Sequence, residues 1–234
     1  MHLHRNFSSS RLVRLLGDWS PVDAKASRQD FAERLGLWLD VSDAITLHAA
    51  HQSLPSQTVA RATVADAGKT WAVEDEFQRV RSALVKAIAA SLAPPTAAPR
   101  AQPATPPVIA DADTTFAPHH QRYLDLQRQM VLRIDALRDH VRQALSRTSP
   151  ALAQLALLDS VLDQMLGKRE QKLLATVPSL LEKRFEQLRQ TQGGPWLDTF
   201  GHDMHTVLLA ELDLRLQPVM GLVDAYRNEN KKTP

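Results

Sequence analysis

The chain has 234 residues, with 28 Lys plus Arg against 26 Asp plus Glu, and therefore a formal net charge of +2. So small an excess gives no argument for a nucleic-acid partner. The sequence contains no Cys, which excludes a disulfide scaffold, a thiol nucleophile and a zinc site with Cys ligands. No window of about 18 apolar residues without charges exists, so no transmembrane segment is expected. Arg11 and Arg14 interrupt the N-terminal apolar run, which argues against a signal peptide. We expect a cytoplasmic protein.

The composition favours an all-α fold. Gly is scarce, at 8 residues, aromatic residues make up 5%, and Leu and Ala, both good helix formers, dominate. Six of the fourteen residues of 94–107 are Pro, a composition typical of extended spacers. We therefore predict a linker over 94–115, between an N-terminal helical unit (1–93) and a C-terminal helical bundle (116–234). Two alternatives stay open: the linker could be a proline-rich ligand, or it could strap together two units that pack on each other.

The first unit is predicted to contain short helices. Apolar residues spaced three or four apart share one helical face, and Pro21 ends the first such segment. Ser27 and Asp30 resemble the start of a second helix. A third is expected near 45–51, a loop over 54–69, and then a helix of about twenty residues. The apolar positions are Leu12, Leu15, Leu16 and Trp19; Phe31, Leu35, Trp38 and Leu39; and Val73, Phe77, Val80, Leu84, Ile88 and Leu92.

The second unit has the more regular pattern. Its first helix carries one apolar stripe, about 100° wide, and Ser149 followed by Pro150 marks the start of the next helix. Gly193, Gly194 and Pro195 predict a chain reversal. The stripe consists of Tyr123, Leu126, Met130, Ile134, Leu137, Val141 and Leu145.

Two prolines lie inside helical patterns that keep their phase, Pro178 and Pro218. Each removes a backbone donor and clashes with the carbonyl four residues earlier. Because the phase is kept, we favour kinks or tight breaks over new helices. The unit as a whole is predicted to be an elongated antiparallel bundle with Pro-kinked helices.

Three stretches carry a resemblance to a known family: ASRQDFAERLGLWL (26–39), REQKLLATVPSLLEKRFEQLR (169–189) and LAELDLRLQPVMGLVDA (209–225). They resemble a proteobacterial family of proteins of unknown function, over nearly the whole chain. No enzymatic activity goes with that family, so the resemblance supplies no catalytic residue. It implies a cytoplasmic component of an envelope-associated bacterial assembly.

No motif points to catalysis or to a cofactor. The glycines are scattered, so phosphate-binding loops and a nucleophile elbow are absent. His48 and His51, like His202 and His205, are spaced so that one metal could join them on a helix, but no third ligand is evident. Surface histidines are the simpler interpretation. A set of acids is interpreted as a solvated helix face and not as catalytic pairs: Glu170, Glu182, Glu186, Glu211 and Asp213. We expect no enzyme, no cofactor and no metal.

Arginines flank the apolar stripe of the first helix of the second unit. They are Arg122, Arg133 and Arg147 on one side, and Arg128, Arg138 and Arg142 towards the other. Such flanking charges set the partner and orientation of packed helices, and acids that could pair with them are Asp159, Asp163, Asp198 and Glu211. The alternative is a phosphate-binding row.

The predicted function is therefore that of a non-enzymatic protein-interaction or scaffold protein, which binds a protein partner or itself through amphipathic helices. A nucleic-acid-associated protein that uses the arginine rows is the alternative. The residues expected to make contacts, within the bundle or to a partner, are Leu126, Met130, Arg133, Leu137, Arg138 and Val141.

Overall fold

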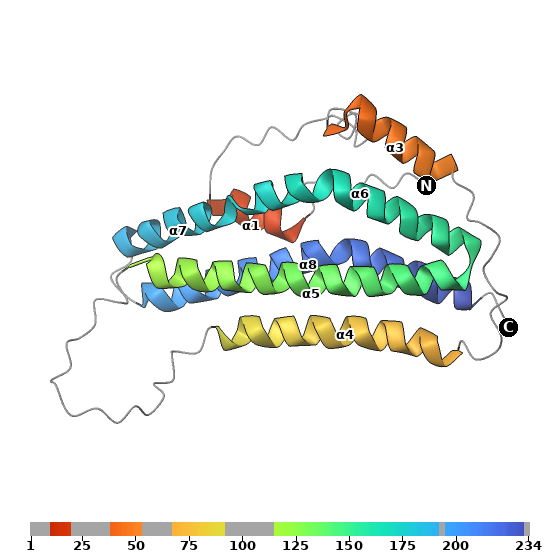
Figure 1. Cartoon of the computed structure of the whole chain (residues 1–234). Coiled ribbons are helices and arrows are strands. Elements are labelled where there is room, and N and C mark those ends of the chain that lie inside the picture. Colours follow the sequence, from red (N-terminus) through yellow and green to blue (C-terminus); the bar gives the residue numbers. More distant parts are fainter. Residues whose placement is uncertain (1–9, 20–37, 53–66, 92–114, 192–194, 232–234) are drawn as a thin grey trace, which may run out of the picture. The chain divides into compact units, whose positions relative to one another are not determined.

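The computed structural model describes residues 10–19, 38–52, 67–91, 115–191 and 195–231 (Figure 1). Within these ranges every regular element is a helix, which confirms the all-α prediction. The helices are α1 (Arg11–Trp19), α3 (Val41–Gln52), α4 (Ala67–Ala90), α5 (Ala117–Thr148), α6 (Pro150–Leu174), α7 (Val177–Thr191) and α8 (Trp196–Asn230).

Several predicted segments lie wholly or partly outside the described residues. They include the helix expected to start near Ser27 and the linker over 94–115. The loop predicted over 54–69 is wrong at its end, because Ala67–Lys69 already belong to α4. Ala and Lys are good helix formers, and they extend the regular helix backwards from its apolar stripe.

The described helices form two compact units. One unit contains α1, α4 from Ser82, α5 up to Val131, α7, and α8 up to Leu214. The other contains α3, α4 up to Arg81, α5 from Leu132, α6, and α8 from Arg215. We call them the α7 unit and the α6 unit. Each combines segments from before and after the proline-rich stretch, which favours the alternative in which the two halves of the sequence pack together.

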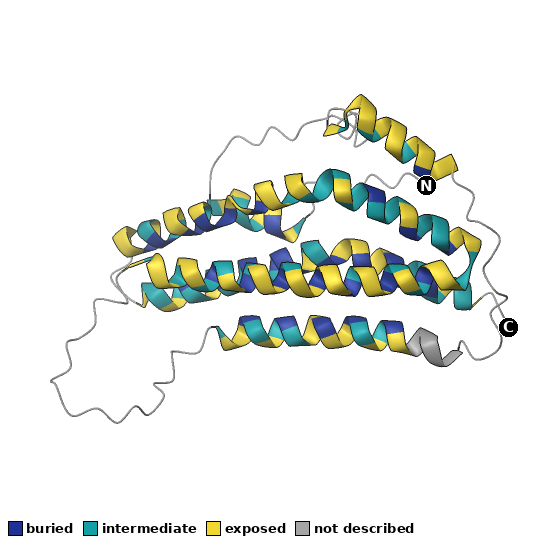
Figure 2. Ribbon diagram, in the orientation of Figure 1, coloured by how far each residue is buried: buried dark blue, intermediate teal, exposed yellow. Residues whose placement is uncertain are grey.

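In both units the core consists of the apolar stripes read from the sequence. Figure 2 shows buried positions recurring along one side of each long helix. The α7 unit buries Leu84 and Ile88 of α4, Tyr123, Leu126 and Met130 of α5, Leu181, Phe185 and Leu188 of α7, and Phe200, Met204, Val207, Leu208 and Leu212 of α8. The α6 unit buries Val73, Phe77 and Val80 of α4, Ile134, Leu137, Val141 and Leu145 of α5, Leu152, Ala156, Val161 and Leu174 of α6, and Leu216, Val219, Leu222, Val223 and Tyr226 of α8.

A single residue separates α5 from α6, and it caps the second helix. Ser149 has extended dihedral angles (φ −151°, ψ 157°), its Oγ accepts a hydrogen bond from Leu152 N at 3.3 Å, and Pro150 is the first helical residue. A side-chain acceptor followed by Pro is the arrangement that satisfies the donors of a helix start. Residues later in α5 pair with residues earlier in α6, as described below, so the two helices are antiparallel.

The two helix-internal prolines have different outcomes. At Pro178 the helical path breaks: α6 ends at Leu174, and Pro178 is the second residue of α7. There the missing N–H costs nothing, because the first donors of a helix have no intrahelical acceptor. Pro178 therefore starts a helix and does not kink one. Pro218 lies inside α8, which continues through it.

Two tryptophan–arginine pairs lie at the short N-terminal helices: Trp19 is the last residue of α1, and Trp38 lies just before α3. In the α7 unit the Arg184 guanidinium lies over the Trp19 ring, 5.4 Å from its centroid. In the α6 unit Arg169 lies over Trp38 at 5.5 Å and donates a hydrogen bond to Trp38 O at 3.2 Å. The helices α1 and α3 each bury one residue, Leu12 and Ala50, and these cation–π contacts add to their attachment.

We predict that Ser149→Ala lowers the free energy of unfolding by about 1 kcal/mol, because it removes the side-chain cap of α6. Urea denaturation followed by circular dichroism measures the change. Ser149→Asp keeps a capping acceptor and should stay close to the wild type. Ser146→Ala, on the exposed last turn of α5, is the matched control. Equal stability of Ser149→Ala and the wild type would contradict the capping role.

Candidate functional site

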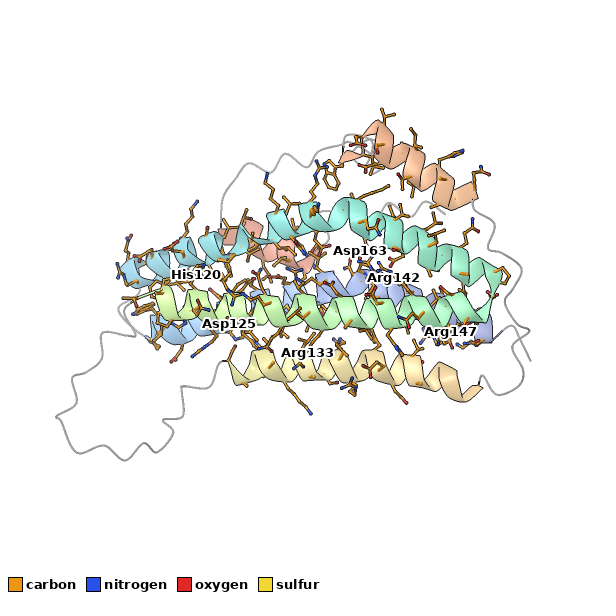
Figure 3. The ribbon with its side chains drawn as sticks, in the orientation of Figure 1. His120, Asp125, Arg133, Arg142, Arg147 and Asp163 are labelled. Carbon is orange, nitrogen blue, oxygen red and sulfur yellow. The ribbon has the colours of Figure 1, made fainter. Side chains whose placement is uncertain are left out.

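A cluster of charged side chains joins α5 to α6 within the α6 unit. Arg138 contacts Asp159 at 2.6 Å and Asp163 at 2.7 Å. Arg142 contacts the same two carboxylates, Asp159 at 2.7 Å and Asp163 at 2.9 Å. Figure 3 labels Arg142 and Asp163, which lie between the two helices. Each arginine side chain retains only 12% to 14% of its accessible surface, so the cluster is largely shielded from water.

This cluster confirms one sequence interpretation for two of the arginines. Arg138 and Arg142 pair with acids of the next helix, and the acids are the predicted Asp159 and Asp163. Burial by itself would lower the pKa of Arg142, but its hydrogen bonds to Asp163 and Asp159 outweigh burial and raise that pKa. Two planar guanidinium groups that share two carboxylates fix both the distance and the register of α5 and α6.

The other flanking arginines do not form one row of accessible cations. Arg122 donates to Ser91 O at 2.7 Å, and Arg128 pairs with Asp125 at 2.7 Å on the same helix. Arg133 and Arg147 are exposed. Only part of each predicted row therefore faces solvent.

Two further acids of the α6 unit, Asp135 and Glu170, lie where the ionised form of the carboxyl group is disfavoured. Burial raises the pKa of Asp135, and the nearby Asp163 raises it further. Burial also raises the pKa of Glu170, against the opposing effect of Arg215 and Arg138. The Arg215 guanidinium is 3.9 Å from the Glu170 carboxylate, too far for a strong hydrogen bond.

The α7 unit contains a fully buried carboxylate, Glu211. It accepts a short hydrogen bond from the Tyr123 hydroxyl, and Gln127 Nε2 donates to its two oxygens at 2.9 and 3.1 Å. Glu211 and Tyr123 are both 0% exposed. The prediction that Glu211 lies on a solvated helix face is therefore wrong. It was also offered as a partner for the arginines, whereas these hydrogen bonds come from a tyrosine and a glutamine.

The sequence pattern gave little signal for this buried site. Charged residues are almost never fully buried without partners, so an acid beside Leu212 reads as a boundary position. Tyr123, in the apolar stripe, was the one available indication, because a buried tyrosine hydroxyl usually finds a hydrogen-bond partner. The rule does not say which residue the Tyr123 hydroxyl will contact. That the partner is Glu211, on another helix, could be identified only from the fold.

The paired histidines are located on helix surfaces. His48, His51 and His202 are exposed, and His205 is half-buried. Burial and the neighbouring His202 lower the pKa of His205. In the part of the chain that the structure describes, no three His, Cys, Asp or Glu side chains are arranged to hold one metal ion.

The four apolar residues predicted to make contacts are all core residues. Leu126 is 7% exposed, Leu137 2%, and Met130 and Val141 0%. The two arginines of the set separate: Arg133 is exposed, whereas Arg138 belongs to the charged cluster. These four side chains are therefore not on the surface of the described structure.

Exposed apolar side chains of the α6 unit occur on α3 and α6, and also at Leu132 of α5 and Met220 of α8. Val41 is 78% exposed, Ile45 65% and Leu173 58%. Leu173 continues a line of half-buried residues that recur every four or seven positions and so share one side of α6; we call this line the α6 leucine row. It consists of Leu155, Leu162, Leu166 and Leu173.

A shallow depression of about 360 Å³ also lies between α5 and α6, beside exposed Leu157. Arg142 and Arg147 line it from α5, and Ala153 and Ala156 line it from α6. Its lining includes no group arranged for acid–base or nucleophilic chemistry. Among the described residues, no helix combines the length and apolar character needed to cross a membrane.

In its described part the chain is all-helical, Arg138 and Arg142 are paired with Asp159 and Asp163, and apolar side chains are exposed on α3 and α6. The chain belongs to the family described as "Protein of unknown function (DUF3348)", whose model matches residues 1–228. The resemblance read from the sequence is thereby confirmed at the level of the family. No curated protein and no solved structure matches the chain.

We predict that Tyr123→Phe lowers the free energy of unfolding by about 1–3 kcal/mol, because a buried carboxylate then loses a hydrogen-bond donor. Chemical denaturation measures the change. Tyr226→Phe is the matched control, since Tyr226 is also buried but its hydroxyl makes no hydrogen bond within the described part of the chain. An equal effect of the two substitutions would contradict a special role for the Tyr123 hydroxyl.

We predict that Glu170→Gln stabilises the protein increasingly as the pH rises. Because the folded-state pKa of Glu170 is raised, ionising it destabilises the fold. This effect is absent below the ordinary glutamate pKa of about 4.3 and complete above the raised folded-state value. Urea unfolding of both proteins between about pH 4 and 7 gives the difference. Glu182→Gln, at an exposed position on α7, should show no such trend. A variant that loses stability relative to the wild type towards pH 7 would show that the Arg215 contact dominates.

Proposed function

We propose that this protein is a non-enzymatic, helical protein-interaction or scaffold protein that uses the outer faces of α3 and α6. The observation that supports the proposal is the α6 leucine row together with Val41 and Ile45. These side chains stay wholly or partly in water, although the same unit buries other apolar side chains of α4, α5, α6 and α8. Grouped apolar side chains on a surface are typical of sites that bind another protein.

The charged groups favour a protein partner over nucleic acid. Arg138 and Arg142, two of the six flanking arginines, are occupied by Asp159 and Asp163, so they do not contribute to a phosphate-binding row. The helix α6 itself contains no aromatic residue on which bases could stack. The nucleic-acid alternative predicts a mobility shift of duplex DNA that weakens steeply with salt, and we expect no shift at low salt.

The finer form of the proposal rests on the family resemblance alone. It makes the protein a cytoplasmic component of an envelope-associated bacterial assembly. The partner would then be another protein of that assembly, bound through an apolar helix face.

The test is affinity capture of the tagged full chain from its native cells, after nuclease treatment, followed by mass spectrometry. We expect one protein in near-equal amount with the wild type, and loss of that protein with Leu173→Asp, which puts a charge in the α6 leucine row. Leu132→Asp is the matched control, because Leu132 is 71% exposed on α5 and should retain the partner. Recovery of the bait alone, together with a salt-sensitive DNA shift, would overturn the proposal.

A further inference from the structure

The helix α6 is apolar on two sides. Leu152 and Leu174 are buried on the side that also carries the charged cluster with α5. Val161 is buried as well, yet it follows Leu152 by nine residues, or about two and a half turns, and so lies on the opposite side. Half-buried Leu158 and Met165 share that opposite side with Val161. We call these three residues the covered face of α6.

The helix α3 lies against the covered face (Figure 1). Gln154 precedes Val161 by seven residues, or about two turns, so the two share one side of α6. Gln154 donates a hydrogen bond to His51 O at 2.7 Å, at the end of α3. Arg169, eight residues after Val161, donates to Trp38 O at 3.2 Å, just before α3 begins. The two helices are therefore antiparallel, and the covered face lies between these two contacts.

The attachment of α3 to α6 is slight. Ala50 is the one buried residue among the twelve of α3, all of which the structure describes, whereas α7, with fifteen residues, buries five. Val41 and Ile45 are exposed and so add little to the attachment. The hydrogen bonds to His51 O and Trp38 O are exposed, where water competes for the same groups. Most buried side chains of the α6 unit belong to α4, α5, α6 and α8, so its core does not depend on α3.

We propose that α3 is a displaceable cover of α6: it detaches as a unit, and the face that it uncovers binds an amphipathic helix of a partner protein, antiparallel to α6. This inference rests on the proposed function, to which it adds the regulation of the α6 surface. Leu158 is three residues from Leu155, and Met165 is three from Leu162, so the covered face adjoins the α6 leucine row. Detachment of α3 joins the two into one apolar surface.

The kind of partner follows from the helix that now occupies the covered face. Helices of other proteins bind such faces through apolar residues at helical spacing. On α3 these are buried Ala50 and half-buried Leu47, three residues apart. A partner helix that buries more apolar residues on the same face displaces α3, because both compete for one site.

Charge indicates the direction in which the partner helix lies. Asp40 and Asp43 stand at the start of α3, at the end of the contact where α6 carries Arg169. Lys168 and Lys172 are exposed on the same part of α6. Acidic residues at the start of a helix are also favoured by its dipole. A partner helix with an acidic start therefore fits the covered face in the antiparallel direction.

Thiol labelling tests the detachment of α3, because the chain has no Cys of its own. We expect a maleimide to label Val161→Cys about tenfold faster than Val141→Cys under native conditions, since α3 opens more often than the core unfolds; Val141 is a fully buried position of α5. Adding Ala50→Asp should speed the labelling of Val161→Cys and leave that of Val141→Cys unchanged, which shows that the core stays folded. Equal rates at the two cysteines in both backgrounds would overturn the inference.

A fluorescent synthetic peptide of residues 38–52 is the probe for the uncovered face. Fluorescence anisotropy should show that it binds the full chain carrying Ala50→Asp about tenfold more tightly than the wild type, because a charge without a partner weakens the attachment of the variant's own α3. The α6 face is identical in the two chains. A peptide carrying Ala50→Asp is the matched control and should not bind. Equal affinity of the unmodified peptide for both chains contradicts a displaceable cover.

Affinity capture separates this inference from the proposed function. The Ala50→Asp chain should capture more of the partner protein than the wild type does. If both chains capture the same amount and Leu173→Asp captures none, the inference fails and the proposed function stands. If the peptide binds the Ala50→Asp chain as expected but the bait alone is recovered from cells, the displaceable cover stands and the proposed function fails.

Discussion

The structure depends on one apolar stripe, that of α5. Seven of its side chains, from Tyr123 to Leu145, are buried at intervals of three or four residues, and they belong to the cores of both compact units. Burial of a large apolar side chain contributes about 1.5–3 kcal/mol, so α5 is a major source of stability in each unit. Part of α5 belongs to each unit, and the apolar residues that α4, α6, α7 and α8 bury lie in these same two units.

Apolar burial is not directional, so polar groups must select the register of the packed helices. In the α6 unit, Arg138 and Arg142 accept only one alignment with Asp159 and Asp163, since both guanidinium groups share both carboxylates. In the α7 unit, the buried Glu211 must meet Tyr123 and Gln127, because a misaligned carboxylate would be desolvated without donors. Each unit thus has a polar feature that penalises helix slippage.

The features that could be predicted from the sequence are those determined by residues close together in the chain. The α5 stripe, the Ser149 cap and the all-α class depend on neighbouring residues and were read correctly. At Pro178 the sequence left a kink and a tight break open, because a preserved apolar phase is compatible with both, and the structure shows a break of two residues between α6 and α7. The buried Glu211 on α8 accepts a hydrogen bond from Tyr123 on α5, and these two residues are 88 positions apart in the sequence. A local sequence pattern cannot reveal such a contact. The sequence offered Asp159 as one of several acids that could pair with Arg138. The antiparallel packing of α5 and α6 brings these two residues together.

The contact residues expected from the sequence illustrate a general ambiguity of amphipathic helices. Leu126, Met130, Leu137 and Val141 have the spacing of an interface, and the fold uses them as core. Once the core residues are known, the apolar residues that stay exposed outside the stripes become informative. On α3, Leu47 and Ala50 account for attachment to α6, whereas Val41 and Ile45 lie on the other side and stay in water. The exposure of these two side chains, and not a sequence motif, is one of the observations on which the proposed interaction role rests.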